Sequence, residues 1–385
     1  MPTYRGDDGA LLHYDVLGGS AAPTLIVLAG GAAQHPAYLG DLAGLSEHHR
    51  LVIPHLRGVG RSSTADLDTM GSRWNQADDV DRLRASLGLE RCAVVAHSAG
   101  TRLAIAYAAR FGDRLSALLL ITPPASYLVD VPSDAPILAA ARMADPVFAA
   151  ATAAFDAGPD TGSEETFNAW QQASAPRGYA SWTSTAQAHA RAGWYSLAAA
   201  RAFFDGDGPT DLRARLGYVL APTLVIAGAQ DATIGVRPVI AVADLFPHGR
   251  AAVIENSGHF PWVENPDAFR APSIPSSPTD NDQHPRRSPP CPLADRLSTL
   301  PLAPVGAFSD YRLVDEHETG WTASTPLTGE TRLRSLARER RSRRPACSFC
   351  GQQDSETQPR PVVAGNGNVA ICEDCAELAL EILKQ

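Results

Sequence analysis

The chain has 385 residues, of which 44% are hydrophobic and 19% charged, and its formal net charge is −9. This length is sufficient for one domain of ordinary size and a further segment. The first 270 residues contain no cluster of Lys and Arg of the kind that binds nucleic acid. No apolar stretch approaches the roughly 18 residues that cross a bilayer, and the N-terminus does not resemble a secretory signal, so we expect a cytoplasmic protein without a membrane segment.

Short β-rich runs alternate with helical stretches over residues 1–270, a pattern typical of a mostly parallel sheet with helices on both faces. Between the fourth and fifth apolar runs, residues 124–220 are rich in Ala and aromatic side chains at helical spacing and predict a helical cap. The predicted fold class is α/β, with a doubly wound, mostly parallel sheet and a cap insert. The expected strands, apolar throughout as burial on both faces requires, are residues 24–28, 50–53, 92–96, 117–121, 223–227 and 251–254.

The composition changes sharply after residue 270. Nine prolines lie between residues 271 and 310, and no apolar period continues, so residues 271–345 are predicted to be a disordered linker. Seven arginines fall within residues 332–344 at its far end. Contact with a polyanion is one interpretation of this run, but no aromatic residues interleave with it, so a solvated tether is preferred.

A candidate nucleophile follows the third apolar run, where residues 96–100 read Ala-His-Ser-Ala-Gly before a helical stretch. This is the strand, nucleophile, helix order of a nucleophile elbow, whose tight turn requires small residues two positions before and after the serine. Asp231 and His259 follow later strands, so that Ser98, Asp231 and His259 all fall at strand ends, where open α/β sheets build their sites. We predict that Ser98 is the nucleophile, His259 its base and Asp231 the carboxylate that orients the imidazole.

Residues 1–270 resemble the α/β-hydrolase fold superfamily in this triad order and in two glycine-containing segments. Residues 28–32 read Leu-Ala-Gly-Gly-Ala where the family has a His-Gly segment, and residues 55–62 read His-Leu-Arg-Gly-Val-Gly-Arg-Ser where it has an Asp-x-Arg-Gly-x-Gly-x-Ser loop. The resemblance implies an oxyanion hole formed by the backbone N–H groups of Gly31 and Ala99. It also implies that the hydrolase needs no cofactor.

The arginine-glycine loop and the cap also resemble the proline iminopeptidase group of serine peptidases, which would make a short peptide the substrate. The elbow and oxyanion loop depart from the Gly-Gly-Ser-Trp-Gly and His-Gly-Gly-Pro-Gly patterns of that group, so esterase and peptidase activities both stay open. Glu164 or Glu165 could hold a substrate amine, although a solvated helix start is the preferred role for both. A final helix that begins near residue 265 is predicted to stop at Pro272, which leaves the hydrolase clipped at its last element.

Four cysteines near the C-terminus form two Cys-x-x-Cys pairs separated by 21 residues. This spacing favours a tetrahedral, structural Zn²⁺ site with Cys347, Cys350, Cys372 and Cys375 as ligands; iron ligation is the alternative. Because residues 346–385 have too little core to fold unaided, zinc binding and folding are expected to be one event. The segment is predicted to be a small treble-type zinc module with four cysteine ligands. The two remaining cysteines stand alone, which disfavours a disulfide framework.

The cysteine pairs and their neighbours resemble the zinc-binding domain of the ClpX unfoldase. The matching features are Gly351, the apolar residues 361–365, residues 369–371 before the second pair, and a predicted helix over 376–384. The resemblance implies dimerisation or recruitment of protein partners. Unfoldase activity is not implied, because the chain has no Gly-x-x-x-x-Gly-Lys-Ser/Thr phosphate loop.

Taken together, the sequence predicts a capped serine hydrolase that cleaves a small-molecule ester or amide, or a short peptide, through an acyl-enzyme. A zinc module for self-association or protein partners is attached to it, and neither a membrane nor nucleic acid is an expected partner. The alternative is a non-catalytic binding protein, in which the clipped hydrolase is inactive and only the zinc module acts.

Overall fold

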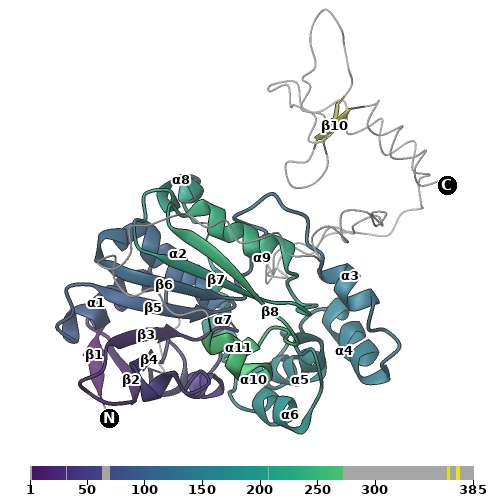
Figure 1. Cartoon of the computed structure of the whole chain (residues 1–385), viewed down its shortest axis with the longest axis horizontal. Coiled ribbons are helices and arrows are strands. Elements are labelled where there is room, and N and C mark those ends of the chain that lie inside the picture. The colour runs from purple at the N-terminus through teal and green to yellow at the C-terminus, as the bar shows by residue number, and fades with distance from the viewer. Residues whose placement is uncertain are drawn as a thin grey trace, which may run out of the picture. The chain divides into compact units, whose positions relative to one another are not determined.

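The computed structural model describes residues 2–31, 33–62, 70–206 and 208–271, together with the backbone of two short strands near the C-terminus. Its centre is an eight-stranded sheet in the order β1-β2-β4-β3-β5-β6-β7-β8 (Figure 1). From β4 onward along this order every neighbouring pair is parallel, whereas β1 and β2 pair antiparallel. The strands are β1 (Thr3–Arg5), β2 (Leu11–Leu17), β3 (Thr24–Leu28), β4 (Arg50–Pro54), β5 (Cys92–His97), β6 (Leu115–Ile121), β7 (Thr223–Gly228) and β8 (Gly249–Ile254).

The sheet confirms the predicted α/β class and each of the six predicted strands, and it adds β1 and β2. The two added strands lie at one edge of the sheet. The apolar residues of β2 are interrupted by His13 and Asp15. Continuous apolar runs identify strands that are covered on both faces, so a strand with polar residues, such as β2, is not recognised in this way.

Successive side chains of the central strands enter two separate cores, as the two-residue period of a strand requires. The first core lies under α1 (Gln76–Ser86), α2 (Gly100–Phe111), α8 (Leu212–Leu216) and α9 (Arg237–Ala241). The second lies under a short 3-10 helix (Pro36–Leu39), α10 (Pro261–Glu264) and α11 (Pro266–Arg270). Strand residues of the first core include Ile26, Leu28, Val94, Ala96, Leu118 and Leu120, and those of the second include Leu25, Val27, Val95, Leu119 and Ile121.

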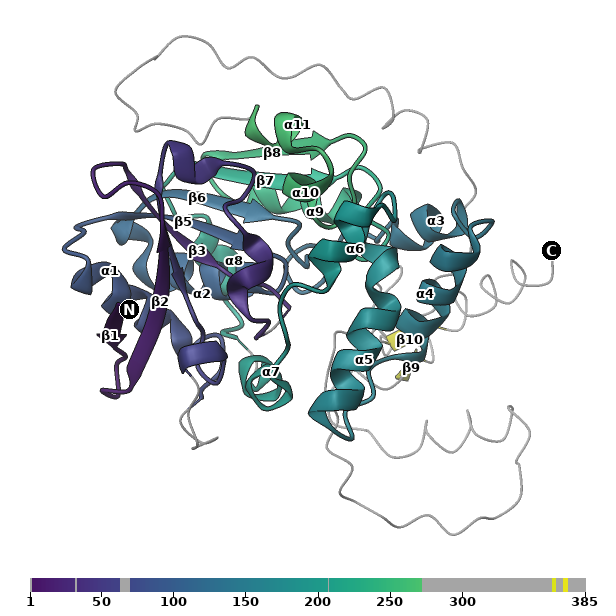
Figure 2. The same cartoon turned by 90° about the horizontal axis from the view of Figure 1, so that it is seen from below.

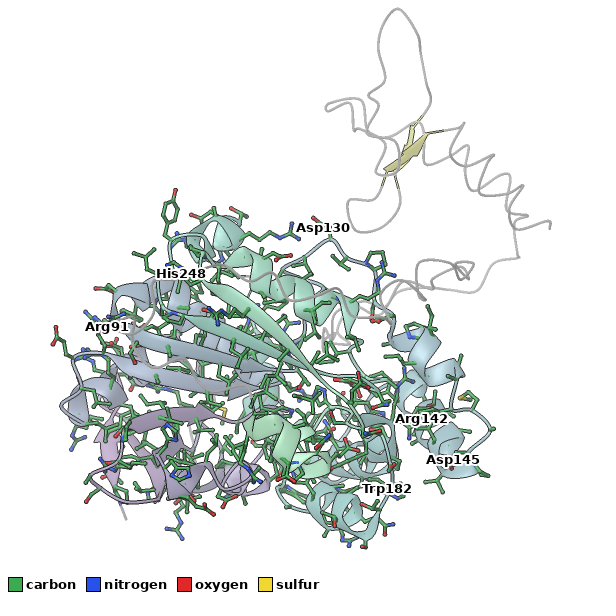
Figure 3. The ribbon with its side chains drawn as sticks, viewed as in Figure 1. Arg91, Asp130, Arg142, Asp145, Trp182 and His248 are labelled. Carbon is green, nitrogen blue, oxygen red and sulfur yellow. The ribbon has the colours of Figure 1, made fainter. Side chains whose placement is uncertain are left out.

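A helical group follows β6 and gathers at the end of the sheet where the parallel strands finish (Figures 1 and 2). It comprises α3 (Ala135–Ala140), α4 (Pro146–Ala157), α5 (Glu164–Ser174) and α6 (Ser184–Ala190), and α7 (Leu197–Phe204) leads back toward the first core. Figure 3 shows Arg142, Asp145 and Trp182 in this group, and Arg91 and His248 at the opposite end of the sheet. Helix starts are set locally by side chains that accept backbone N–H groups of the first turn, namely Asp145, Ser163, Thr183 and Ser196.

The described residues up to 271 end with two short helices that face the second core. Trp262 of α10 and Phe269 of α11 are both buried, with ring centroids 6.3 Å apart. Asn265 caps α11 by accepting the N–H of Ala268. The last helix is therefore short, as expected from the sequence, and it still contributes an aromatic side chain to the core.

The chain divides into two units, Met1–Val314 and Asp315–Gln385. In the second unit, β9 (Val362–Ala364) pairs antiparallel with β10 (Ala370–Cys372), and Val363 lies opposite Ile371. Cys372 ends β10, whereas Cys347, Cys350 and Cys375 lie outside the described residues. The predicted linker, 271–345, also lies outside them except for its first residue.

No helix in the described ranges combines the length and the apolar character needed to cross a membrane.

Candidate active site

Ser98 sits in a strained turn between β5 and α2. Its φ angle is +49°, a left-handed value that non-glycine residues rarely adopt, and its N–H donates to the carbonyl of Ile121 at 2.9 Å. Gly100 allows the turn to approach β3, because a Cβ at this position would overlap the carbonyl oxygen of Ala29. The glycine two positions after the serine is therefore needed for close backbone packing, and the turn presents the hydroxyl at the end of the strand.

The structure brings the three residues predicted as a triad into one hydrogen-bonded chain. The Nε2 atom of His259 lies 2.8 Å from the Oγ atom of Ser98, and its Nδ1 atom lies 2.7 Å from Oδ2 of Asp231. Because the carboxylate only accepts, Nδ1 carries the proton, and Nε2 is free to accept the serine hydroxyl proton. This arrangement can activate a hydroxyl for attack on a carbonyl carbon.

The carboxylate and the imidazole of this chain are both held by backbone groups. Asp231 is fully buried, and its Oδ1 atom accepts the N–H groups of Thr233 at 2.9 Å and Ile234 at 3.2 Å. The N–H of His259 donates to the carbonyl of Gly178, at 2.6 Å, in the helical group that follows β6. The base loop is therefore anchored to the cap as well as to the sheet.

Gly31 and Ala99, the predicted oxyanion donors, lie at the ends of β3 and β5, which are adjacent parallel strands. Gly31 has a φ of +65°, and a Cβ there would overlap the ring of Tyr195, so only glycine fits. Ala99 precedes the first turn of α2. Within the described ranges, neither backbone N–H donates to another group of the chain. Both N–H groups can therefore donate hydrogen bonds to an oxyanion that develops on the substrate.

Glu264 of α10 supports the base loop, and sequence reasoning missed it. Its carboxylate accepts three backbone N–H groups, from Gly258 and Ala180 at 2.7 Å and from Ser181 at 3.2 Å. Burial raises the pKa of Glu264 to about 6, against the effect of these hydrogen bonds. One side chain thus joins the loop that carries His259 to the cap segment. A Glu five residues after the candidate His was the available signal, but nothing local in the sequence indicates its partners.

The arginine-glycine loop of residues 55–62 has a structural role. Arg57 is buried and its guanidinium donates to Asp79 and to Asp8, each at 2.6 Å for the shortest bond. His55, which stands where the family has an aspartate, lies 2.9 Å from Asp15 through Nε2. The Arg57 ion pairs and the His55–Asp15 hydrogen bond fasten the loop to α1 and β2.

His13, Asp15 and His55 place three potential metal-ligand atoms within 4.8 Å of one another. However, Nδ1 of His55 accepts the N–H of Arg61 at 3.2 Å, so its proton is on Nε2 and points to Asp15. A metal ion would have to displace that proton and break the Arg61 bond. The cluster is therefore better described as a hydrogen-bonded His-Asp pair with a neighbouring histidine.

Glu164 and Glu165 begin α5 and are both exposed. The Glu164 carboxylate accepts the indole N–H of Trp194 and the N–H of Leu197, each at 3.1 Å. It therefore ties α5 to the start of α7, and these bonds engage one of the two carboxylates that were considered for a substrate amine.

The family model described as alpha/beta hydrolase fold matches residues 23–266. The chain belongs to the α/β hydrolase fold family. The match covers the predicted triad positions, the sheet from β3 onward and the cap, and the topology of the sheet agrees with it. The hydrolase class predicted from the sequence is therefore confirmed at the level of the family.

The curated proteins that this chain resembles in sequence include proline iminopeptidases, and the solved structures that share its fold include an esterase. A proline iminopeptidase of Xylella fastidiosa (strain 9a5c) is 29% identical over 114 residues, which are 30% of this chain and 36% of that protein. The chain spans about two fifths of the length of the curated relatives it matches. Among solved structures, a proline iminopeptidase of Mycobacterium smegmatis has a TM-score of 0.54 at 23% identity, over 70% of this chain and 95% of the other. A thermophilic esterase of Thermogutta terrifontis has a TM-score of 0.51 at 24% identity, over 70% and 95%. These two structures share the fold.

Residues 345–385 match the family model of the ClpX C4-type zinc finger. The predicted resemblance of the C-terminal segment is therefore confirmed. Four cysteine thiolates are a donor set that suits a structural Zn²⁺ ion.

Proposed function

We propose that this protein is a serine hydrolase that cleaves an ester or amide bond through an acyl-enzyme. The observation that carries the proposal is the chain of contacts from Ser98 Oγ to His259 Nε2, 2.8 Å, and from His259 Nδ1 to Asp231 Oδ2, 2.7 Å. The buried carboxylate and the left-handed serine support the same assignment, as do the N–H groups of Gly31 and Ala99, which are unengaged within the described residues.

In the proposed first step, Ser98 Oγ attacks the substrate carbonyl carbon while its proton moves to Nε2 of His259. The carbonyl oxygen becomes an oxyanion and accepts the N–H groups of Gly31 and Ala99. The bond to the leaving oxygen or nitrogen then breaks, and His259 returns the proton to that atom. Water repeats the sequence on the acyl-enzyme, which releases the acid and restores Ser98.

For the substrate, the contacts of the cap favour a small ester or an amide without a recognised N-terminal amine. A peptidase that releases N-terminal residues needs an acceptor for the substrate ammonium group. Of the two carboxylates considered, Glu164 already accepts N–H groups from Trp194 and Leu197, and Glu165 is exposed in the first turn of α5. We therefore expect p-nitrophenyl esters of short acids to be turned over faster than proline p-nitroanilide. The reverse order would favour the iminopeptidase assignment.

We also propose the following division of the chain: a hydrolase domain over residues 1–270 with a cap insert over 124–220, a linker over 271–345, and a zinc module over 346–385. Cys347, Cys350, Cys372 and Cys375 would hold a structural Zn²⁺, and the module would bind a protein partner or a second copy of the chain. The match to the ClpX C4-type zinc finger supports this part of the proposal.

A fluorophosphonate probe tests the central claim, because only an activated serine reacts with it. The full chain should be labelled, and Ser98→Ala should abolish labelling and lower turnover by on the order of 10³-fold or more. Ser86→Ala, a surface serine of α1, is the matched control and should be labelled like the original chain. Absence of labelling in a folded, zinc-loaded full chain would instead favour a binding protein in which only the zinc module acts.

A further inference from the structure

A chain of hydrogen bonds runs beneath the candidate nucleophile, through Tyr38 and His97. The backbone N–H of Gly30 lies 2.6 Å from the Tyr38 hydroxyl, the same hydroxyl lies 2.9 Å from Nδ1 of His97, and Nε2 of His97 lies 3.1 Å from the carbonyl oxygen of His259. None of these contacts is used in the proposed reaction steps. They nevertheless join the oxyanion loop to the loop that carries the base.

The direction of every bond in this series follows from its two ends. The carbonyl of His259 can only accept, so Nε2 of His97 carries the proton and Nδ1 is an acceptor. Tyr38 must then donate its hydroxyl proton to Nδ1, and its oxygen accepts the N–H of Gly30. The tautomer of His97 is therefore fixed, and both ring nitrogens and the hydroxyl proton are paired.

Tyr38 and His97 are almost fully buried, each with 2% of its surface exposed, beside the second core. Their rings pack against Phe260 and Trp262. Packing alone would be served by apolar side chains, and buried polar groups are costly unless each is paired. The pairing here is directed at the two backbone segments whose positions matter most for the proposed chemistry.

We propose that Tyr38 and His97 are positioning residues, which fix the oxyanion loop and the base loop relative to Ser98. His97 immediately precedes the nucleophile on β5, so one residue links the nucleophile, the N–H donor loop and the base. The inference rests on the proposed serine hydrolase function. Neither side chain touches the reacting atoms, and their effect is transmitted through Gly30, the neighbour of Gly31, and through the main chain of His259.

The charge of His97 is consistent with this role. Burial, together with the nearby His259, lowers the pKa of His97 well below the usual histidine range. The two rings lie 4.9 Å apart between centroids, so a second positive charge there would oppose the imidazolium that His259 becomes during the reaction. A neutral His97 can support the base without that penalty.

Two substitutions of His97 remove its two hydrogen bonds one at a time: the bond from Tyr38 to Nδ1 and the bond from Nε2 to the carbonyl of His259. In His97→Asn the side-chain oxygen can still accept from Tyr38, but the shorter side chain cannot reach the carbonyl of His259. In His97→Gln the amide can still donate to His259, whereas the link to Tyr38 is lost. We expect kcat to fall about 10- to 100-fold in each variant with KM changed less than about threefold, because displacements near 1 Å at a reacting group have effects of that order.

The two variants should differ in their dependence on the leaving group. His97→Asn disturbs the proton donor, so it should slow alkyl esters more than p-nitrophenyl esters, whose leaving group needs no proton. His97→Gln disturbs the oxyanion donor and should slow both ester types equally. A loss caused only by weakened folding would not separate the two ester types in this way.

Tyr38→Phe removes one hydroxyl while keeping the ring, and it should lower kcat to a similar extent as His97→Gln. Because both changes break the same link, the double variant should be less than about threefold slower than the slower single variant. Tyr107→Phe is the matched control, since Tyr107 is also fully buried, but its hydroxyl pairs with Cys92, at the opposite end of β5 from Ser98, and with Asp81 of α1. It should keep the kcat of the original chain.

Three results would overturn the inference: a folded Tyr38→Phe protein with unchanged kcat, fully multiplicative effects in the double variant, or imidazole nitrogen NMR that places the His97 proton on Nδ1. The NMR measurement needs no activity. If the original chain shows no Ser98-dependent probe labelling, the proposed function is refuted instead. Failure of the positioning role and failure of the hydrolase function can therefore be told apart.

Discussion

Replacing Asp231 with Asn should reverse the tautomer of the base. The Oδ1 atom of Asp231 accepts two backbone N–H groups, from Thr233 at 2.9 Å and Ile234 at 3.2 Å. In Asp231→Asn the amide oxygen must keep this position, since an NH₂ group there would face two donors. The NH₂ group then points at Nδ1 of His259, which has to become an acceptor. The proton moves to Nε2, and that nitrogen can no longer accept the proton of Ser98.

The expected loss in kcat is on the order of 10⁴-fold, equivalent to about 5.5 kcal/mol of activation free energy, as is typical for a wrong base tautomer. It should stay smaller than the loss for His259→Ala. The rate of fluorophosphonate labelling and the hydrolysis of p-nitrophenyl esters both measure it. Asp134→Asn is the control, because Asp134 is also buried and accepts backbone N–H groups of Val236 and Arg237 without touching a histidine. A folded Asp231→Asn protein that loses less than tenfold would refute the reasoning.

Three further predictions concern stability and zinc. Phe269→Ala should lower the free energy of unfolding by about 3–5 kcal/mol in denaturant titrations, because Phe269 is only 3% exposed. The control is Tyr218→Ala, which should change this free energy by less than about 0.5 kcal/mol because Tyr218 is 83% exposed. Equal effects of the two substitutions would place α11 outside the core. Burial raises the pKa of Glu264 from 4.5 in the unfolded chain to about 6 in the folded protein, so the folded state binds this proton more tightly. Protonation of Glu264 therefore stabilises the fold fully below pH 4.5, and this stabilisation is lost as the pH rises through 6. Relative to Glu264→Gln, the original protein should therefore lose roughly 2 kcal/mol of unfolding free energy between pH 4 and pH 7, and parallel pH curves would contradict this. Chelation of zinc from the full chain should abolish association through the C-terminal module while ester hydrolysis continues; turnover that falls in step with the zinc content would show that the module completes the hydrolase.

The central strands could be predicted from the sequence because their environment leaves a plain pattern. β3, β5 and β7 are covered on both faces, so nearly every residue is apolar, and β3 begins and ends where predicted. β2 was not predicted as a strand, because His13 and Asp15 interrupt its apolar residues. Its pairing with β4 depends on contacts distant in the chain, such as Val16 opposite Val52. Local composition does not indicate such pairing between distant segments.

The candidate site divides in the same way. Ser98, Asp231 and His259 could be proposed because each follows a recognisable strand within a short motif, and parallel strands bring their ends together. Glu264 accepts the N–H groups of Ala180 and Ser181, far away in the sequence, and the Tyr38 hydroxyl joins Gly30 to the side chain of His97. A side chain that accepts main-chain N–H groups needs no particular partner residue. The sequence therefore points to the proposed reacting groups, whereas the residues proposed to hold them in place can be identified only from the folded structure.

The left-handed backbone at Ser98 means that this turn stores conformational energy in the folded state. A non-glycine residue at such a φ angle costs roughly 1–3 kcal/mol, a noticeable fraction of the total stability of a domain. Glycine at position 98 would relieve that cost. Where catalysis is not required, replacing the serine by glycine would therefore make the fold more stable. Ser98→Gly should accordingly melt at a higher temperature than Ser98→Ala, and the proposed activity and the stability of the fold place opposite demands on this position.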